Sequence, residues 1–83
     1  MLKINEVYTE KDIFCGNRMR ISRVVGLTNI VVFFIEFIID LGGSLVIQNT
    51  VEPISMYKSI RIRTNKKVWY KLARQYAKRN QNR

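Results

Sequence analysis

Basic and apolar residues alternate along Arg18–Val25, and β-branched residues gather at the end of this segment. A period of two is typical of a strand with one solvent-facing side. Gly26–Asn29 has the composition of a turn. Ile54–Thr64 is expected to form another strand, with a bend, in which Arg61 and Arg63 point to the same side. If the two strands lie in one sheet, they present arginines on one face.

The segment Ile30–Asp40 is apolar almost throughout. Glu36 and Asp40 lie four residues apart, as on one side of a helix, but the many β-branched residues favour a strand. Leu41–Ser44 then provides a hairpin connection into a strand at Leu45–Val51. We therefore predict a hairpin whose two carboxylates face solvent and are not a catalytic pair.

The C-terminal residues have a helical period. Thr64 or Asn65 can cap a helix over residues 66–80. Its apolar members recur at helical spacing, and four basic residues at i, i+4, i+7 and i+11 form a second line: Lys67, Lys71, Arg74 and Lys78. We expect Trp69 and Tyr76 to lie in the core. A short helix is also expected at Asn5–Lys11.

These elements predict a mainly β (α+β) fold, in which a small, strongly bent antiparallel sheet or barrel of four or five strands precedes a basic C-terminal helix. The 83 residues are expected to form a single domain, with the β meander over residues 18–64 and the helical extension over residues 65–83. A chain of this size buries a limited core and commonly gains stability by oligomerising or by binding a partner.

Charge is divided unevenly along the chain. The net charge is +9, yet residues 24–57 hold no Lys or Arg, while the last 26 residues hold ten basic residues and no acidic one. Interspersed signs would solubilise a fold better than this segregation does. A concentrated positive field attracts polyanions, so nucleic acid is the first candidate partner.

Several kinds of chemistry find no support in the composition. The chain has no histidine and a single cysteine, Cys15, so neither a zinc cluster nor an internal disulfide is expected. Its four glycines do not have the spacing of a phosphate-binding loop. We expect a binding protein without catalysis or cofactor. The N-terminus lacks the pattern of a secretory signal, and an intracellular, reducing setting fits best.

A membrane anchor is a weaker hypothesis. Residues 27–47 are apolar and have about the length of a membrane span, roughly 20 residues. However, Glu36 and Asp40 lie within this segment, and a carboxylate at the bilayer centre costs about 2.5–3.5 kcal/mol on insertion scales. A strand hairpin therefore explains the segment better than a transmembrane helix does.

Two stretches resemble the Sm-like family. Ile39–Asn49 is similar to the first Sm motif, in which an aromatic–Asp pair precedes an apolar strand that ends near an Asn, with Ile39 in place of the aromatic residue. Asn49–Val51 followed by Met56–Ile60 resembles the Hfq-type second half. The likeness covers about residues 18–63. It implies a small bent barrel that builds rings and binds RNA, with Tyr57 and Lys58 at the RNA-contacting rim and in the subunit contact. Ser59 stands where the family has a histidine.

The sequence therefore predicts a small basic nucleic-acid-binding protein that binds RNA or single strands through a basic sheet face and the C-terminal helix. The other hypotheses are a structural subunit of a ribonucleoprotein such as a ribosome, an interaction module or inhibitor for an acidic protein, and a protein anchored in a membrane. A homo-oligomer is a further alternative. The nucleic-acid-binding residues would be Arg18, Arg20, Tyr57, Lys58, Arg61, Arg63, Lys67, Tyr70, Lys71, Arg74 and Lys78.

Overall fold

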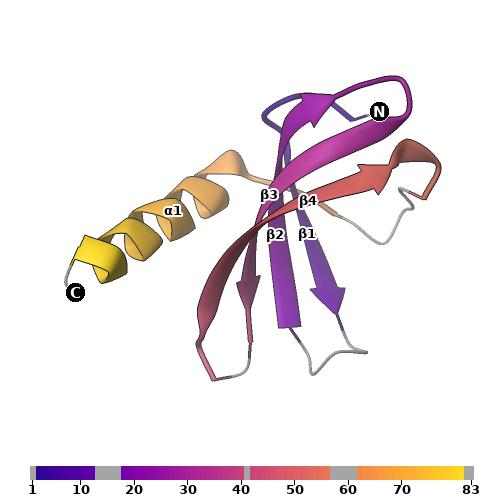
Figure 1. The fold of residues 1–83 in the computed structure, drawn as a ribbon. Coiled ribbons are helices and arrows are strands. Elements are labelled where there is room, and N and C mark those ends of the chain that lie inside the picture. The colour runs from indigo at the N-terminus through magenta and orange to yellow at the C-terminus, as the bar shows by residue number, and fades with distance from the viewer. Residues whose placement is uncertain (1, 13–17, 41, 57–61, 82–83) are drawn as a thin grey trace.

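The structure is a computed structural model that describes residues 2–12, 18–40, 42–56 and 62–81. An open antiparallel sheet has the strand order β4-β3-β2-β1-β5, and one α-helix lies on one side of it (Figure 1). The predicted mainly β fold with a C-terminal helix is confirmed. The elements are β1 (Val7–Asp12), β2 (Arg18–Leu27), β3 (Val31–Ile39), β4 (Leu45–Pro53), the 3₁₀ helix η1 (Ile54–Met56), β5 (Ile62–Thr64) and α1 (Lys66–Gln81).

The predicted N-terminal helix at Asn5–Lys11 is wrong, because Asn5 lies in a turn and residues 7–11 belong to β1. β1 pairs with β2 along its whole length and with β5 over Val7–Thr9. The Thr9 hydroxyl lies 2.6 Å from the Thr64 hydroxyl across the β1–β5 pair. Asn5 has a left-handed φ of 72°, which ends any helical path just before the strand. Hydrogen bonding to strands on both sides therefore outweighs any helical preference of the charged residues in this segment.

β2 is confirmed as a strand but extends to Leu27, so the turn begins later than predicted. Thr28 closes it, because its Oγ1 accepts the amide N–H groups of Ile30 and Val31 at 3.1 and 3.0 Å. A bulge interrupts the β2–β3 register at Val24 and Gly26. A Cβ on Gly26 would lie 3.1 Å from the Phe33 ring, so glycine permits this close approach.

The apolar segment that begins at Ile30 is confirmed as a strand, β3. Apolar and polar residues do not alternate along β3, because side chains on both faces of this strand pack into hydrophobic clusters. Phe37 joins Val7, Ile21 and Trp69 in a cluster beneath α1. On the opposite face, a second cluster consists of Leu2, Tyr8, Val24, Val32 and Phe34, with Ile54 packed against it. Within the described ranges, neither helix is long and apolar enough to span a bilayer.

The predicted β3–β4 hairpin is confirmed. Asp40 holds its turn, since the carboxylate accepts the Ser44 amide at 2.9 Å and the carbonyl accepts the Gly43 amide at 3.1 Å. Gly43 has a φ of 79°, a conformation that favours glycine. β4 runs on to Pro53, two residues beyond the predicted end.

The prediction of one bent strand over Ile54–Thr64 is only partly right. Residues 54–56 form η1, residues 57–61 lie outside the described ranges, and only Ile62–Thr64 is assigned to β5. The strand order explains this result. β4 and β5 form opposite edges of the sheet, so η1, which follows β4 directly, and β5 do not belong to one strand.

Candidate nucleic-acid interface

The helix α1 starts at the predicted cap. The Asn65 side-chain oxygen accepts the Lys67 amide at 2.9 Å, and the Asn65 carbonyl accepts the Val68 amide at 3.1 Å. Because Asn65 alone lies between β5 and α1, the end of the strand fixes where the helix begins. The first helical turn carries no acidic residue, which leaves the positive end of the helix dipole unneutralised.

Trp69 sets the rotation of α1 against the sheet. Its indole N–H donates to the Ile35 carbonyl at 3.0 Å, and its ring lies 5.2 Å from the Phe37 ring. Tyr76, two turns later, lies 6.1 Å from the same Phe37 ring. The prediction that both aromatic residues pack in the core is confirmed for buried Trp69, and Tyr76 packs against the same cluster while half-buried.

The rotation set by Trp69 turns the basic stripe (Lys67, Lys71, Arg74 and Lys78) outward, and all four side chains are exposed. At 3.6 residues per turn, this stripe lies about half a turn around the helix from Trp69, Leu72, Ala73 and Tyr76. Along the axis it spans about 16 Å, given a rise of 1.5 Å per residue. The predicted stripe is therefore a continuous cationic surface along most of α1.

Tyr70 and Arg23 extend this surface toward the sheet. Tyr70 is 40% exposed and meets the Trp69 ring edge-on at 5.1 Å. The Arg23 guanidinium lies 4.6 Å from the Trp69 ring centre and 5.5 Å from that of Tyr70. Arg23 is not among the binding residues predicted from the sequence. Successive side chains of a strand point to opposite faces, so Arg23 lies on the face opposite to that of Arg18 and Arg20. This alternation in the sequence could have separated Arg23 from the other two arginines.

Two open recesses meet at the start of α1. One is lined by Asn65, Lys66, Lys67, Tyr70 and Arg74. The other is lined by Glu6, Val7, Arg63, Thr64, Asn65 and Lys66. Because they share Asn65 and Lys66, the hollowed surface continues from the helix to the end of β5. Here a basic surface meets an exposed aromatic ring.

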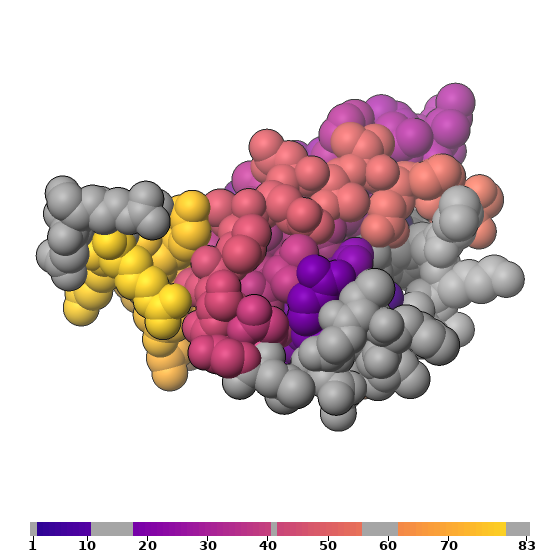
Figure 2. Space-filling view, turned by 60° about the horizontal axis from the view of Figure 1, so that its bottom comes forward, coloured from indigo at the N-terminus to yellow at the C-terminus, as the bar shows by residue number. Residues whose placement is uncertain are grey.

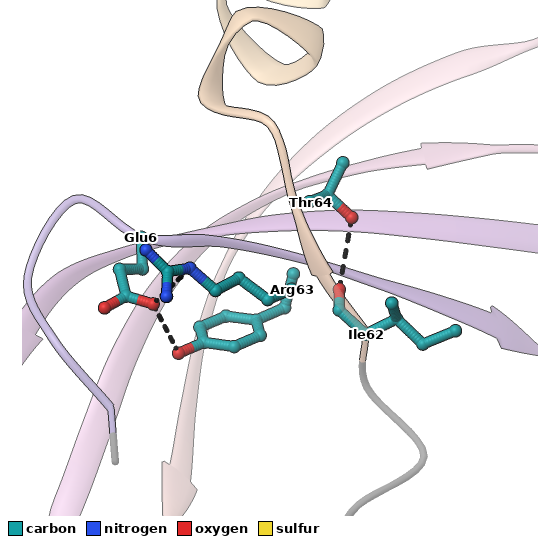
Figure 3. Close-up of polar contacts among 5 residues, drawn as sticks. Glu6, Ile62, Arg63 and Thr64 are labelled. Atoms are coloured by element: carbon teal, nitrogen blue, oxygen red, sulfur yellow. Dashed lines mark hydrogen bonds and ion pairs between the residues drawn. The ribbon is translucent and has the colours of Figure 1, made fainter.

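The sheet arginines within the described ranges, Arg18, Arg20 and Arg63, share a face, as predicted. Arg20 lies opposite Glu10 and Arg63 lies opposite Tyr8, while Arg18 is two residues before Arg20. However, this face also holds carboxylates. The Arg63 Nε atom lies 3.2 Å from a Glu6 carboxylate oxygen, which also accepts the Tyr8 hydroxyl at 3.0 Å (Figure 3). Arg18 and Arg20 also interact with other residues of the chain.

A polar row crosses all five strands on this face: Arg63, Tyr8, Ser22, Glu36 and Gln48 are successive register partners. The prediction that Glu36 faces solvent is wrong, because Glu36 is fully buried and accepts the Ser22 hydroxyl at 2.8 Å. The predicted solvent exposure holds for Asp40. The sheet face is thus a mixed-charge surface with a buried acid, whereas the described part of α1 carries no acid at all.

Three predicted site residues, Tyr57, Lys58 and Arg61, lie outside the described residues. Among the residues that are described, no group of three His, Cys, Asp or Glu side chains is placed to hold a metal ion. Comparison with protein families, curated proteins and solved structures finds no match for this chain. Its function must therefore be argued from the surface itself.

Proposed function

We propose that this protein binds nucleic acid, RNA or single strands in particular, through the outer face of α1 and the adjoining Tyr70 and Arg23. The observation that carries the proposal is the basic stripe, which is exposed over its whole length and has no acidic residue beside it on the helix. An ordinary solvated helix face mixes both signs of charge. A surface of one sign is suited to a polyanion.

The length of the stripe suits a phosphate backbone. Its span of about 16 Å corresponds to roughly five phosphates at about 3.4 Å per nucleotide along one strand. The four side chains are long and flexible, so they can follow a backbone that is not a regular duplex. Lys66 and the unneutralised helix start lie beside the stripe and add positive potential at one end.

The exposed ring of Tyr70 favours unpaired bases. An aromatic side chain beside a basic groove provides a surface on which a splayed-out base stacks, at about 1–3 kcal/mol per base. Bases within a duplex are already stacked and cannot use such a ring. In addition, α1 is the only α-helix in the described ranges, so no two-helix DNA-reading unit is found there. We therefore expect single strands to rank above duplex DNA.

The proposal is tested by fluorescence anisotropy with labelled single-stranded RNA, single-stranded DNA and duplex DNA of equal length, each over a range of salt concentrations. Binding should weaken steeply with salt, with a log–log slope of about −0.7 per phosphate contact for single strands. No binding at low salt would reject the proposal. Salt-insensitive binding would also contradict it, because phosphate contacts release counterions.

Replacing Tyr70 separates stacking from charge. Tyr70→Ala should weaken binding to single strands by about 1–3 kcal/mol without changing the salt slope, because it removes a ring and no charge. Duplex affinity should change little. Val68→Ala is the matched control, since Val68 is exposed on the same helix and also carries no charge. Equally weakened binding in the two variants would indicate damage to the helix instead of the removal of a base-stacking ring.

An acidic protein is the competing partner for the same surface. If an acidic protein is the partner, the chain should bind that one protein saturably. Nucleic acids of any kind should then bind only weakly, even at low salt. The Sm-like resemblance remains a prediction, because the two residues that it singles out, Tyr57 and Lys58, lie outside the described ranges. A subunit of a ribonucleoprotein would also contact phosphates through the basic stripe, but it would bind strongly only to the RNA of its own particle.

A further inference from the structure

The edge strand β4 has an unusually open outer side. It is nine residues long, and in the described part of the chain it pairs only with β3. Proteins commonly protect such an edge with lysine, a bulge or an early proline. β4 has no Lys or Arg, its register with β3 is unbroken, and its one proline is its last residue. In Figure 2, β4 (pink to orange-red) lies on the surface, with α1 beside one end of it.

The register reveals which backbone groups face outward. The Asp40 amide bonds the Ser44 carbonyl at 3.3 Å, and the Ile54 amide bonds the Ile30 carbonyl at 2.8 Å. In an antiparallel ladder, hydrogen-bonded pairs alternate with pairs that are not bonded. The even-numbered residues of β4 therefore bond β3, and the odd-numbered residues direct their N–H and C=O groups to the outer edge. Pro53 is odd-numbered, so its missing N–H costs the β3 ladder nothing.

We propose that two copies of this chain dimerise by antiparallel pairing of their β4 strands, centred on Asn49. In this register Asn49 lies opposite Asn49 of the second copy. Ile47 lies opposite Val51, so apolar side chains meet on the face that carries α1, and Gln48 lies opposite Thr50 on the other face. The outward N–H and C=O groups of Ile47, Asn49 and Val51 then all find backbone partners, while Leu45 lies opposite Pro53 and donates its N–H to the Pro53 carbonyl without receiving a bond in return.

Exposure and charge both support a second copy as the occupant. Val51 is 56% exposed, a large fraction for an apolar residue within a strand. Two chains of charge +9 repel each other, and they approach most easily through a surface without cations. Residues 24–57, which include all of β3 and β4, hold no Lys or Arg. The opposite edge, β5, is only three residues long and contains Arg63.

The two-fold axis of such a pair runs perpendicular to the sheet. Both α1 helices would then lie on the same side of one continuous sheet that joins the two copies. The inference does not depend on nucleic-acid binding, because the oligomeric state is measured with the protein alone.

Sedimentation velocity over a wide concentration range provides the first test. The wild-type mass should rise from one chain toward two and stop there. Asn49→Lys should stay monomeric at all concentrations, because two ammonium groups would face each other across the axis. Ile30→Lys is the control, since Ile30 is 73% exposed, lies outside β4 and gains the same charge. Circular dichroism should show that both variants remain folded.

Cysteine cross-linking then tests the register in a Cys15→Ser background. Hydrogen-bonded partners in an antiparallel pair have Cα atoms about 5.5 Å apart, within the range of about 4.4–6.8 Å that a disulfide spans. Asn49→Cys should therefore form a covalent dimer on mild oxidation. Val51→Cys should not, because the two Val51 positions would be about 14 Å apart at about 3.4 Å per residue.

Four results would overturn the proposal: a wild-type chain that stays monomeric, masses that grow beyond two chains, an Asn49→Lys variant that still dimerises, or equal cross-linking at both cysteine positions. Growth beyond two chains would indicate head-to-tail pairing of β4 with another edge instead of the two-fold contact.

Discussion

Trp69→Ala is expected to lower the free energy of unfolding by about 3–5 kcal/mol. The indole is buried, contacts Phe37, carries the Arg23 guanidinium over its ring and donates to the Ile35 carbonyl. Marginal stability of roughly 0.05–0.15 kcal/mol per residue gives an 83-residue chain about 4–12 kcal/mol in total. A large part of the total stability should therefore disappear, as measured by urea denaturation followed by far-UV circular dichroism.

Two further variants separate the causes of this destabilisation. Trp69→Phe keeps a ring in the cluster but removes the N–H donor, so it should cost less than the alanine change. Val68→Ala, the neighbouring position on the exposed side, should change the free energy of unfolding by less than about 1 kcal/mol. If Trp69→Ala had no larger effect than Val68→Ala, α1 would not pack on the sheet as described.

The elements with a strong local signal could be predicted from the sequence. The alternation at Arg18–Val25 marks β2, and the spacing of Trp69, Leu72, Ala73 and Tyr76 marks both α1 and its buried side. β1 could not be recognised in this way. Its strand state depends on pairing with β2 and with β5, which is more than 50 residues away in the chain, and no local pattern records such partners.

The candidate site was predictable on the helix and less so on the sheet. Helical spacing alone places the basic stripe on the side of α1 opposite its apolar residues. Every member of the stripe is accordingly exposed. The sheet arginines were predicted to share a face, and this is right for Arg18, Arg20 and Arg63. The carboxylates on that face, Glu6 beside Arg63 and the buried Glu36, became evident only in the folded chain. Their positions depend on the pairing of β1 and β3 with their neighbours, whose register the sequence does not specify.

Removal of the basic stripe is expected to have the largest effect on binding. The combined variant Lys67→Ala, Lys71→Ala, Arg74→Ala and Lys78→Ala should weaken single-strand affinity at low salt by about 100-fold or more, because phosphate contacts supply most non-specific binding. The log–log salt slope should become less steep by about 0.7 for each phosphate that the variant no longer neutralises. Alanine preserves helix propensity, and the replaced side chains are exposed, so the fold should remain. Fluorescence anisotropy at several salt concentrations measures both effects.

Single substitutions distinguish a located surface from net charge alone. Lys71→Ala and Lys3→Ala each remove one exposed positive charge, but only Lys71 belongs to the stripe. The Lys71 change should lower the affinity and reduce the salt slope, whereas the Lys3 change should leave the slope unaltered, because a charge that makes no phosphate contact releases no counterion. Equal effects of the two variants would mean that nucleic acid responds to the overall +9 charge and that α1 is not its binding surface.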